Sequence, residues 1–136
     1  MLDYVFNICC SICTISSSFL GLTYGEFCIL AFCIVQPIIV LLFGIINYKN
    51  ILGKITIFLW SIVLIFYTSN YSVTTDSFLK IYQDLHVWAV HLGISYICVN
   101  FILYIIIPSL FVCTNLFHIL QLFIFKPSKK TDIPKS

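Results

Sequence analysis

The stretch EFCILAFCIVQPIIVLLFGIINY, residues 26–48, decides the fold class of this chain. Its single charged side chain, Glu26, stands at its first position. At about 1.5 Å per residue, a helix of this length crosses the ~30 Å hydrocarbon core of a bilayer. Gln36 and Pro37 lie near its middle, where proline frees a backbone carbonyl and favours a kink. The stretch therefore predicts a transmembrane helix that needs a polar partner for that carbonyl.

Similar apolar segments continue on both sides, at residues 4–20, 51–69, 85–107 and 109–125. The turn at Lys49-Asn50 is so short that segments 26–48 and 51–69 are expected to form an antiparallel hairpin. Only Pro108-Ser109 separates the last two segments, so they form a tight hairpin, one long kinked helix, or a span followed by a helix in the interface. The sequence predicts an all-α polytopic membrane protein, a bundle of four to five transmembrane helices in one domain, residues 1–126. A polar, lysine-rich tail, residues 127–136, follows.

The composition supports this fold class. Hydrophobic residues make up 61% of the 136-residue chain and charged residues 9%, against about 25% charged in a typical soluble domain. A soluble fold of this size cannot bury so much apolar surface. The expected partners are the lipid bilayer and other membrane subunits of a hetero-oligomeric complex, not nucleic acid.

Charges gather between the segments and set the expected sidedness. With five spans, Lys80 and the tail lysines share one side, opposite Lys49 and Lys54. With four spans, the tail joins Lys49 and Lys54, which leaves Lys80 alone. The four-span arrangement is the more asymmetric, so the positive-inside rule favours it.

Seven cysteines are present, and Cys10 and Cys13 have the C-x-x-C spacing of redox and zinc sites. There is no second C-x-x-C pair and no histidine nearby. A buried cysteine also packs as a small apolar residue, and this structural role is favoured.

Three histidines, His86, His91 and His118, lie inside or beside the last two segments. Ionisable groups in a membrane are functional candidates, and facing helices that each contribute a histidine can ligate haem. His86 and His91 are five residues apart, so they cannot face one metal from a straight helix. They are candidates for haem binding, with an interfacial or structural role as the favoured alternative.

Segment 109–125 also carries polar residues on one face, at Thr114, His118 and Gln121, with Asn115 beside them and Asn100 on the preceding segment. We expect these side chains to bond to neighbouring helices. The alternative is a stripe that lines a cavity or faces a partner subunit.

No charged side chain lies in the middle of a segment, and no phosphate loop or metalloprotease motif occurs. The loops are too short to build an aqueous active site. We expect no catalytic activity from the chain alone, although it could belong to an oxidoreductase complex.

Two family resemblances bear on that complex. The stretch from Lys54 through Trp60 to Thr75-Asp76-Ser77-Phe78, followed by Leu85-His86-Val87, resembles the later helices of cytochrome c oxidase subunit 3. That family has an Asp-Ser pair in the corresponding loop and His-Val at the start of the next span. The resemblance implies a subunit of a respiratory-chain electron-transport complex.

The second resemblance rests on His91-Leu-Gly93-Ile94 and Asn100-Phe101, which is similar to the H-x-G-[IM]…D-Y pattern of the membrane anchor of succinate dehydrogenase. It implies that His91 ligates haem b. Asn100 and Phe101 stand where that family has Asp and Tyr, which argues against a quinone site.

These observations favour a non-catalytic membrane subunit that acts in packing, lipid contact and partner docking. All seven cations are lysines, among many Ile, Phe, Tyr and Asn residues, a usage typical of an AT-rich genome. The mitochondrial inner membrane is the expected location, and a bacterial inner membrane is the alternative. The other function considered is a bacterial or phage membrane protein that assembles with itself: a holin, a defence pore or an immunity protein.

Overall fold

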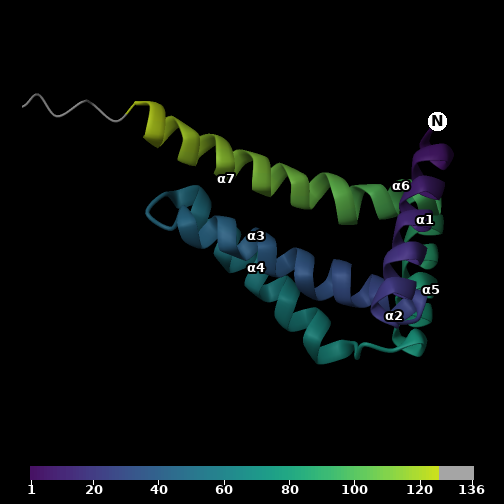
Figure 1. The fold of residues 1–136 in the computed structure, drawn as a ribbon. Coiled ribbons are helices and arrows are strands. Elements are labelled where there is room, and N and C mark those ends of the chain that lie inside the picture. The colour runs from purple at the N-terminus through teal and green to yellow at the C-terminus, as the bar shows by residue number, and fades with distance from the viewer. Residues whose placement is uncertain (126–136) are drawn as a thin grey trace, which may run out of the picture.

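The structure is a computed structural model that describes residues 1–125, and all of its regular structure is helical. Five continuous helices follow one another in this part of the chain (Figure 1). Their elements are α1 (Leu2–Leu20); α2 (Tyr24–Cys28), the π-helix η1 (Ile29–Val35) and α3 (Gln36–Ile46) in one helix; α4 (Ile51–Asn70); α5 (Thr75–Leu92); and α6 (Tyr96–Phe101), the π-helix η2 (Ile102–Ile106) and α7 (Ile107–Ile124) in one helix.

Four of these helices are long and apolar enough to cross a membrane: Leu2–Leu20, Tyr24–Ile46, Ile51–Asn70 and Tyr96–Ile124. The prediction of an all-α membrane helix bundle is confirmed. The first three helices begin and end within two residues of the predicted segments 4–20, 26–48 and 51–69. The predicted tail, residues 127–136, lies outside the described residues.

The last third of the chain is divided differently from the prediction. The prediction of separate helices at 85–107 and 109–125 is wrong. In the structure one helix ends just before Gly93, and the next runs without interruption through Pro108. Gly93 ends α5 with φ 66°, a left-handed conformation that glycine adopts without a steric penalty. Ser95 then begins the next helix by accepting a hydrogen bond from the backbone N–H of Cys98 at 3.2 Å. Of the three arrangements considered for the Pro108 junction, the structure has the single long helix.

The helix starts follow from local capping chemistry. Each of four helices begins after a polar residue whose side-chain oxygen accepts a hydrogen bond from a backbone N–H of the first turn. At Thr23 the cap is reciprocal, because the Glu26 carboxylate also accepts a bond from the Thr23 backbone N–H at 2.9 Å. The four capping residues are Thr23, Asn50, Thr74 and Ser95.

Helices α3 and α4 form the expected antiparallel hairpin, and its closeness depends on glycine. A Cβ atom placed on Gly53 would lie 2.0 Å from the backbone oxygen of Asn47, and one on Gly44 would lie 3.1 Å from Thr56. Small residues let helix backbones approach in this way. The hairpin can therefore pack this tightly only with glycine at position 53.

Helix α7 packs along the hairpin through one side. Trp60 on α4 and Phe111 on α7 meet edge to face, with ring centroids 5.7 Å apart. Asn115 on the same side of α7 is fully buried. The three helices α3, α4 and α7 thus form the body of the bundle.

Helices α1 and α5 lie across one end of this body (Figure 1). Both contact α2 and α6, the first turns of the two long helices. Ile81 of α5 is buried against Ile29 and Cys33 of the helix Tyr24–Ile46. The fold therefore has two parts, a three-helix body and a pair of crosswise helices at one of its ends.

The loop between α4 and α5 is tied to both helices by Tyr71. Its hydroxyl donates to Asp84 Oδ2 at 3.3 Å, and Lys80 Nζ lies 5.7 Å from the centre of its ring. Partial burial and the Asp84 carboxylate both raise the pKa of the Tyr71 hydroxyl. These contacts hold α5 across the end of the bundle.

Candidate functional site

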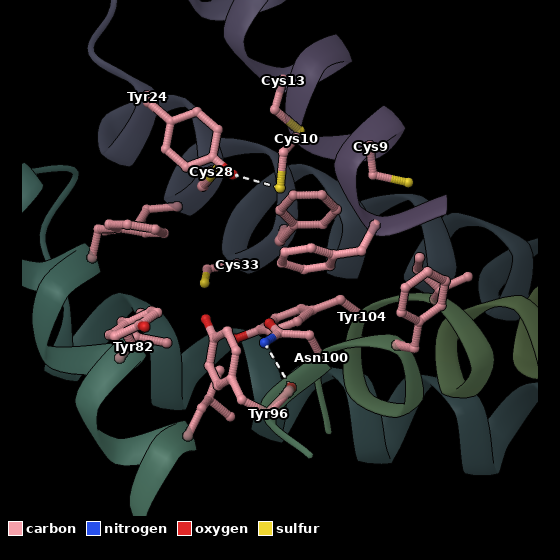
Figure 2. A pocket seen from close by; sticks show the side chains of 18 residues that line it. Cys9, Cys10, Cys13, Tyr24, Cys28, Cys33, Tyr82, Tyr96, Asn100 and Tyr104 are labelled. Carbon is pink, nitrogen blue, oxygen red and sulfur yellow. Dashed lines mark hydrogen bonds between the residues drawn. The ribbon is translucent and has the colours of Figure 1, made fainter. Parts of the chain in front are cut away.

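A cavity of about 120 Å³ lies where the crosswise helices meet the bundle. Its wall is built from α1, α2, η1, α5, α6 and η2 (Figure 2). The lining is mostly aromatic, aliphatic and sulfur-bearing. Its members are Phe6, Cys9, Cys10, Cys13, Tyr24, Cys28, Ile29, Phe32, Cys33, Phe78, Ile81, Tyr82, Leu85, Tyr96, Asn100, Phe101, Tyr104 and Ile105.

Both π-helical segments lie in the cavity wall, and each precedes a proline. Pro37 and Pro108 have no backbone N–H to offer the carbonyl four residues earlier, which belongs to Cys33 and Tyr104 respectively. The backbone N–H groups just before the prolines bond five residues back, from Gln36 to Ala31 and from Ile107 to Ile102. Such π turns concentrate at functional sites.

The carbonyl of Tyr104 finds its hydrogen bond on another helix. The side-chain amide of Gln36 donates to it across the gap between the two long helices. The sequence predicted that the proline in the helix of Gln36 would need such a partner. In the structure, Gln36 is itself the partner of the other helix: its side-chain amide donates to the carbonyl that Pro108 leaves without a backbone N–H.

Few polar atoms reach into the cavity. The Tyr24 hydroxyl donates to Cys10 Sγ at 3.5 Å, and the Asn100 amide donates to the backbone oxygen of Tyr96 at 3.1 Å (Figure 2). The Tyr104 hydroxyl lies 3.4 Å from that of Tyr67. The residues of the described chain that form the wall carry thiols, phenols and one amide but no carboxylate or imidazole. Its chemistry fits enclosure of an apolar group and offers no paired acid and base.

All seven cysteines are free thiols, and five of them line the cavity. Cys9 and the C-x-x-C pair Cys10 and Cys13 come from α1, while Cys28 and Cys33 come from the helix Tyr24–Ile46 (Figure 2). Within residues 1–125, no three histidine, cysteine or acidic side chains are close enough to hold a metal ion.

The structure does not bring the three candidate haem ligands together. His86 and His91 are exposed on α5, whereas His118 lies near the far end of α7. The ring of His86 stacks on Tyr96 with centroids 4.6 Å apart, and its Nε2 lies 3.1 Å from the Tyr82 hydroxyl. His91 Nδ1 bonds the backbone oxygen of Val87 at 2.8 Å.

The motif around His91 coincides with the end of a helix. Gly93 is the left-handed residue that closes α5, and the backbone N–H of Ile94 bonds the oxygen of Ala89 at 3.1 Å. Asn100 and Phe101 lie in the cavity wall instead. The residues similar to the succinate dehydrogenase anchor therefore lie in two separate places.

A second polar site joins the three helices of the body. Asn115 donates to Thr56 Oγ1 at 2.9 Å and accepts a bond from the Asn47 amide at 3.1 Å. The Asn50 amide lies 2.8 Å from His118 Nε2. Asn115 and His118 thus bond to neighbouring helices, as expected of the polar face.

The other members of the predicted polar face behave differently. Thr114 is exposed and donates only to its own helix, at 2.7 Å to the oxygen of Leu110. The roles of Asn47, Thr56 and Gln36 in joining helices were missed by the sequence reading. These residues could have been noticed as polar side chains in otherwise apolar segments. The sequence, however, does not indicate which of them bond to one another.

These features define an integral membrane protein of the all-α class, with a cysteine- and tyrosine-lined cavity near one end. Comparison with protein-family models, curated proteins and solved structures found no match.

Proposed function

We propose that this protein is a non-catalytic membrane subunit of a larger assembly, and that a respiratory-chain complex of the mitochondrial inner membrane is the assembly to test first. Its work would be packing, lipid contact and partner docking. The observation that carries the proposal is the outer face of α7. Within residues 1–125, this helix contacts α3 and α4 through one side, and the side chains on the opposite side are exposed.

In the first two turns of α7, on that side, Ser109 and Cys113 are exposed four residues apart. Residues at this spacing share a helix face, and these two lie opposite the buried Asn115. Pairs of small residues let a second transmembrane helix approach closely, whereas a purely lipid-facing surface has no need of them. The large apolar residues Leu116, Phe117 and Leu120 around this pair are also exposed.

The buried polar groups support a packing role. In residues 1–125, no buried side-chain nitrogen or oxygen lacks a hydrogen-bond partner. The buried residues Asn47, Thr56 and Asn115 bond to one another across helices. These polar side chains are used to hold the body together.

The test is native electrophoresis of membranes solubilised in mild detergent, with mass spectrometry of the band that contains this chain. A band of unlike subunits in fixed ratio, with haem or flavin proteins among them, supports the proposal and names the complex. A ladder that contains only this chain contradicts it and favours a self-assembling pore or holin.

A matched pair of variants connects this test to the outer face of α7. We expect Ser109→Leu with Cys113→Leu to remove the chain from the assembly, because the added side chains hold a partner helix away. Phe117→Leu on the same face should leave the band in place. If the double variant still migrates with every partner, the docking surface lies elsewhere.

A further inference from the structure

Helix α5 has a buried face and a charged face. Ile81 and Ala89 are buried against the bundle. Asp76, Lys80 and Asp84, at helical spacing on the opposite side, are exposed. A charged side chain in hydrocarbon costs several kcal/mol, so this face has to meet water or lipid headgroups.

Helix α1 has two exposed faces besides the one that lines the cavity. One exposed face is apolar and the other is polar, and each runs the whole length of the helix. The apolar face consists of Tyr4, Ile8, Ile12, Ile15 and Phe19. The polar face consists of Asp3, Asn7, Ser11, Thr14 and Ser18.

Helices α1 and α5 run in a different direction from the other three helices. Figure 1 shows α1 and α5 running across the end of the helices Tyr24–Ile46 and Tyr96–Ile124. They contact the N-terminal parts of those helices, at α2 and α6. At about 1.5 Å per residue the two long helices measure roughly 35 and 43 Å, enough for the hydrocarbon core and more. If these helices cross the membrane, α1 and α5 run along its surface.

We propose that α1 and α5 lie in the headgroup region of one leaflet, parallel to the membrane plane, and that three helices span: Tyr24–Ile46, Ile51–Asn70 and Tyr96–Ile124. Amphipathic helices in this position bury an apolar face about 5–10 Å deep and keep a polar face in the headgroups. The apolar face of α1 then meets acyl chains while its polar face meets headgroups and water. The charged face of α5 points away from the hydrocarbon.

The position of Trp88 agrees with this placement. Its side chain is 66% exposed near the end of α5, and tryptophan concentrates at membrane–water interfaces. The chain has only one other tryptophan, Trp60, which is 6% exposed in the middle of α4. Trp60 would therefore lie deep in the bilayer and Trp88 at its surface.

Depth measurement by fluorescence quenching tests the placement of α1. The full chain, with Trp60→Phe and Trp88→Phe, is reconstituted in phosphatidylcholine vesicles that carry bromine either near the headgroup or near the chain ends. Tyr4→Trp, Ile12→Trp and Phe19→Trp each place one tryptophan on the exposed apolar face of α1, where the side chain disturbs no packing. The proposal requires the same ratio of shallow to deep quenching at all three positions.

A helix that crosses the bilayer gives a different profile. Ile51→Trp and Ile62→Trp, at the start and middle of α4, serve as the spanning control in the same background. Ile62→Trp should be quenched mainly by deep bromines and Ile51→Trp by shallow ones. If Ile12→Trp is quenched as deeply as Ile62→Trp while Tyr4→Trp and Phe19→Trp stay shallow, α1 spans the membrane and the proposal is overturned.

Discussion

Asn115 joins the three helices of the body through its side-chain amide. Its amide is fully buried and bonds Thr56 on α4 and Asn47 at the end of α3. Interhelical hydrogen bonds in membranes contribute about 0.6 kcal/mol each on average. Loss of one partner also leaves buried polar groups unsatisfied, at a cost of about 1–3 kcal/mol.

We therefore expect Asn115→Leu to lower the free energy of unfolding in detergent by about 2 kcal/mol. Unfolding by a denaturing detergent, followed by circular dichroism, measures it. The neighbouring Thr114→Val is the control, because Thr114 is exposed and bonds only its own helix. Equal losses in the two variants would show that the buried bonds contribute nothing.

Gly53 gives a second prediction at this scale. A Cβ atom there would lie 2.0 Å from the Asn47 oxygen, which is backbone and cannot turn aside, whereas one on Gly44 would meet side-chain atoms at 3.1 Å. Gly53→Ala should destabilise the protein by about 3 kcal/mol or more, and Gly44→Ala by about 1 kcal/mol. The same unfolding measurement decides, and the reverse order would contradict the close approach at Gly53.

The residue types of this body were visible in the sequence, but their pairing was not. Asn115 and His118 could be assigned to helix contacts because polar groups in apolar segments seek partners. Asn47 and Thr56 come from other segments, and the rotation of those helices about their axes decides which side chains meet. Local sequence does not determine that rotation, so the buried network required the structure.

At the scale of elements, the two prolines explain the two π turns. Pro108 frees the carbonyl of Tyr104, and Gln36 from the neighbouring helix donates to it. The helix can therefore continue where the sequence suggested a break. The predicted segments were divided at Pro108, with one long kinked helix as an alternative, because the sequence does not identify the hydrogen-bond partner from another segment.

A double-mutant cycle tests this account. Gln36→Leu alone should cost about 1–3 kcal/mol, because the Tyr104 carbonyl is left unpaired. In a Pro108→Ala background, the new backbone N–H can bond that carbonyl, and Gln36→Leu should then cost about 1 kcal/mol less. Strict additivity of the two changes would mean that Gln36 does not serve the freed carbonyl.

The cavity could not be predicted from any single segment of the sequence. Its cysteines and tyrosines come from four separate helices, and the packing role expected for the cysteines stays a prediction. The amphipathic character of α5 was also present in the sequence, at Asp76, Lys80 and Asp84. The residues of α5 were assigned partly to a loop and partly to a membrane span, because His86, Val87 and Trp88 resembled the start of a transmembrane helix.

For the whole molecule, charge and topology agree on one orientation. The end that carries α1 and α5 holds Asp3, Glu26, Asp76 and Asp84 with Lys80, whereas the turn at the other end holds Lys49, with Lys54 beside it. By the positive-inside rule, we expect the end with Lys49 and Lys54 to face the cytoplasm, or the matrix if the membrane is that of a mitochondrion.

Thiol labelling tests the orientation. In intact cells or mitoplasts, an impermeant maleimide should label Gln83→Cys on α5 and leave Lys49→Cys unlabelled until the membrane is opened. The unmodified chain measures the background from its native cysteines. Labelling of Lys49→Cys alone in the intact sample would reverse the orientation.

The crosswise helices also give the molecule an unequal cross-section. In the proposed placement, three helices pass through both leaflets, and α1 and α5, which lie across one end of the body in Figure 1, add their lengths to one leaflet only. A body of this shape acts as a wedge, because it expands one leaflet more than its opposite. We expect such a wedge to favour strongly bent membrane, such as the rim of a fold or the wall of a tubule, and to collect there without a sorting signal.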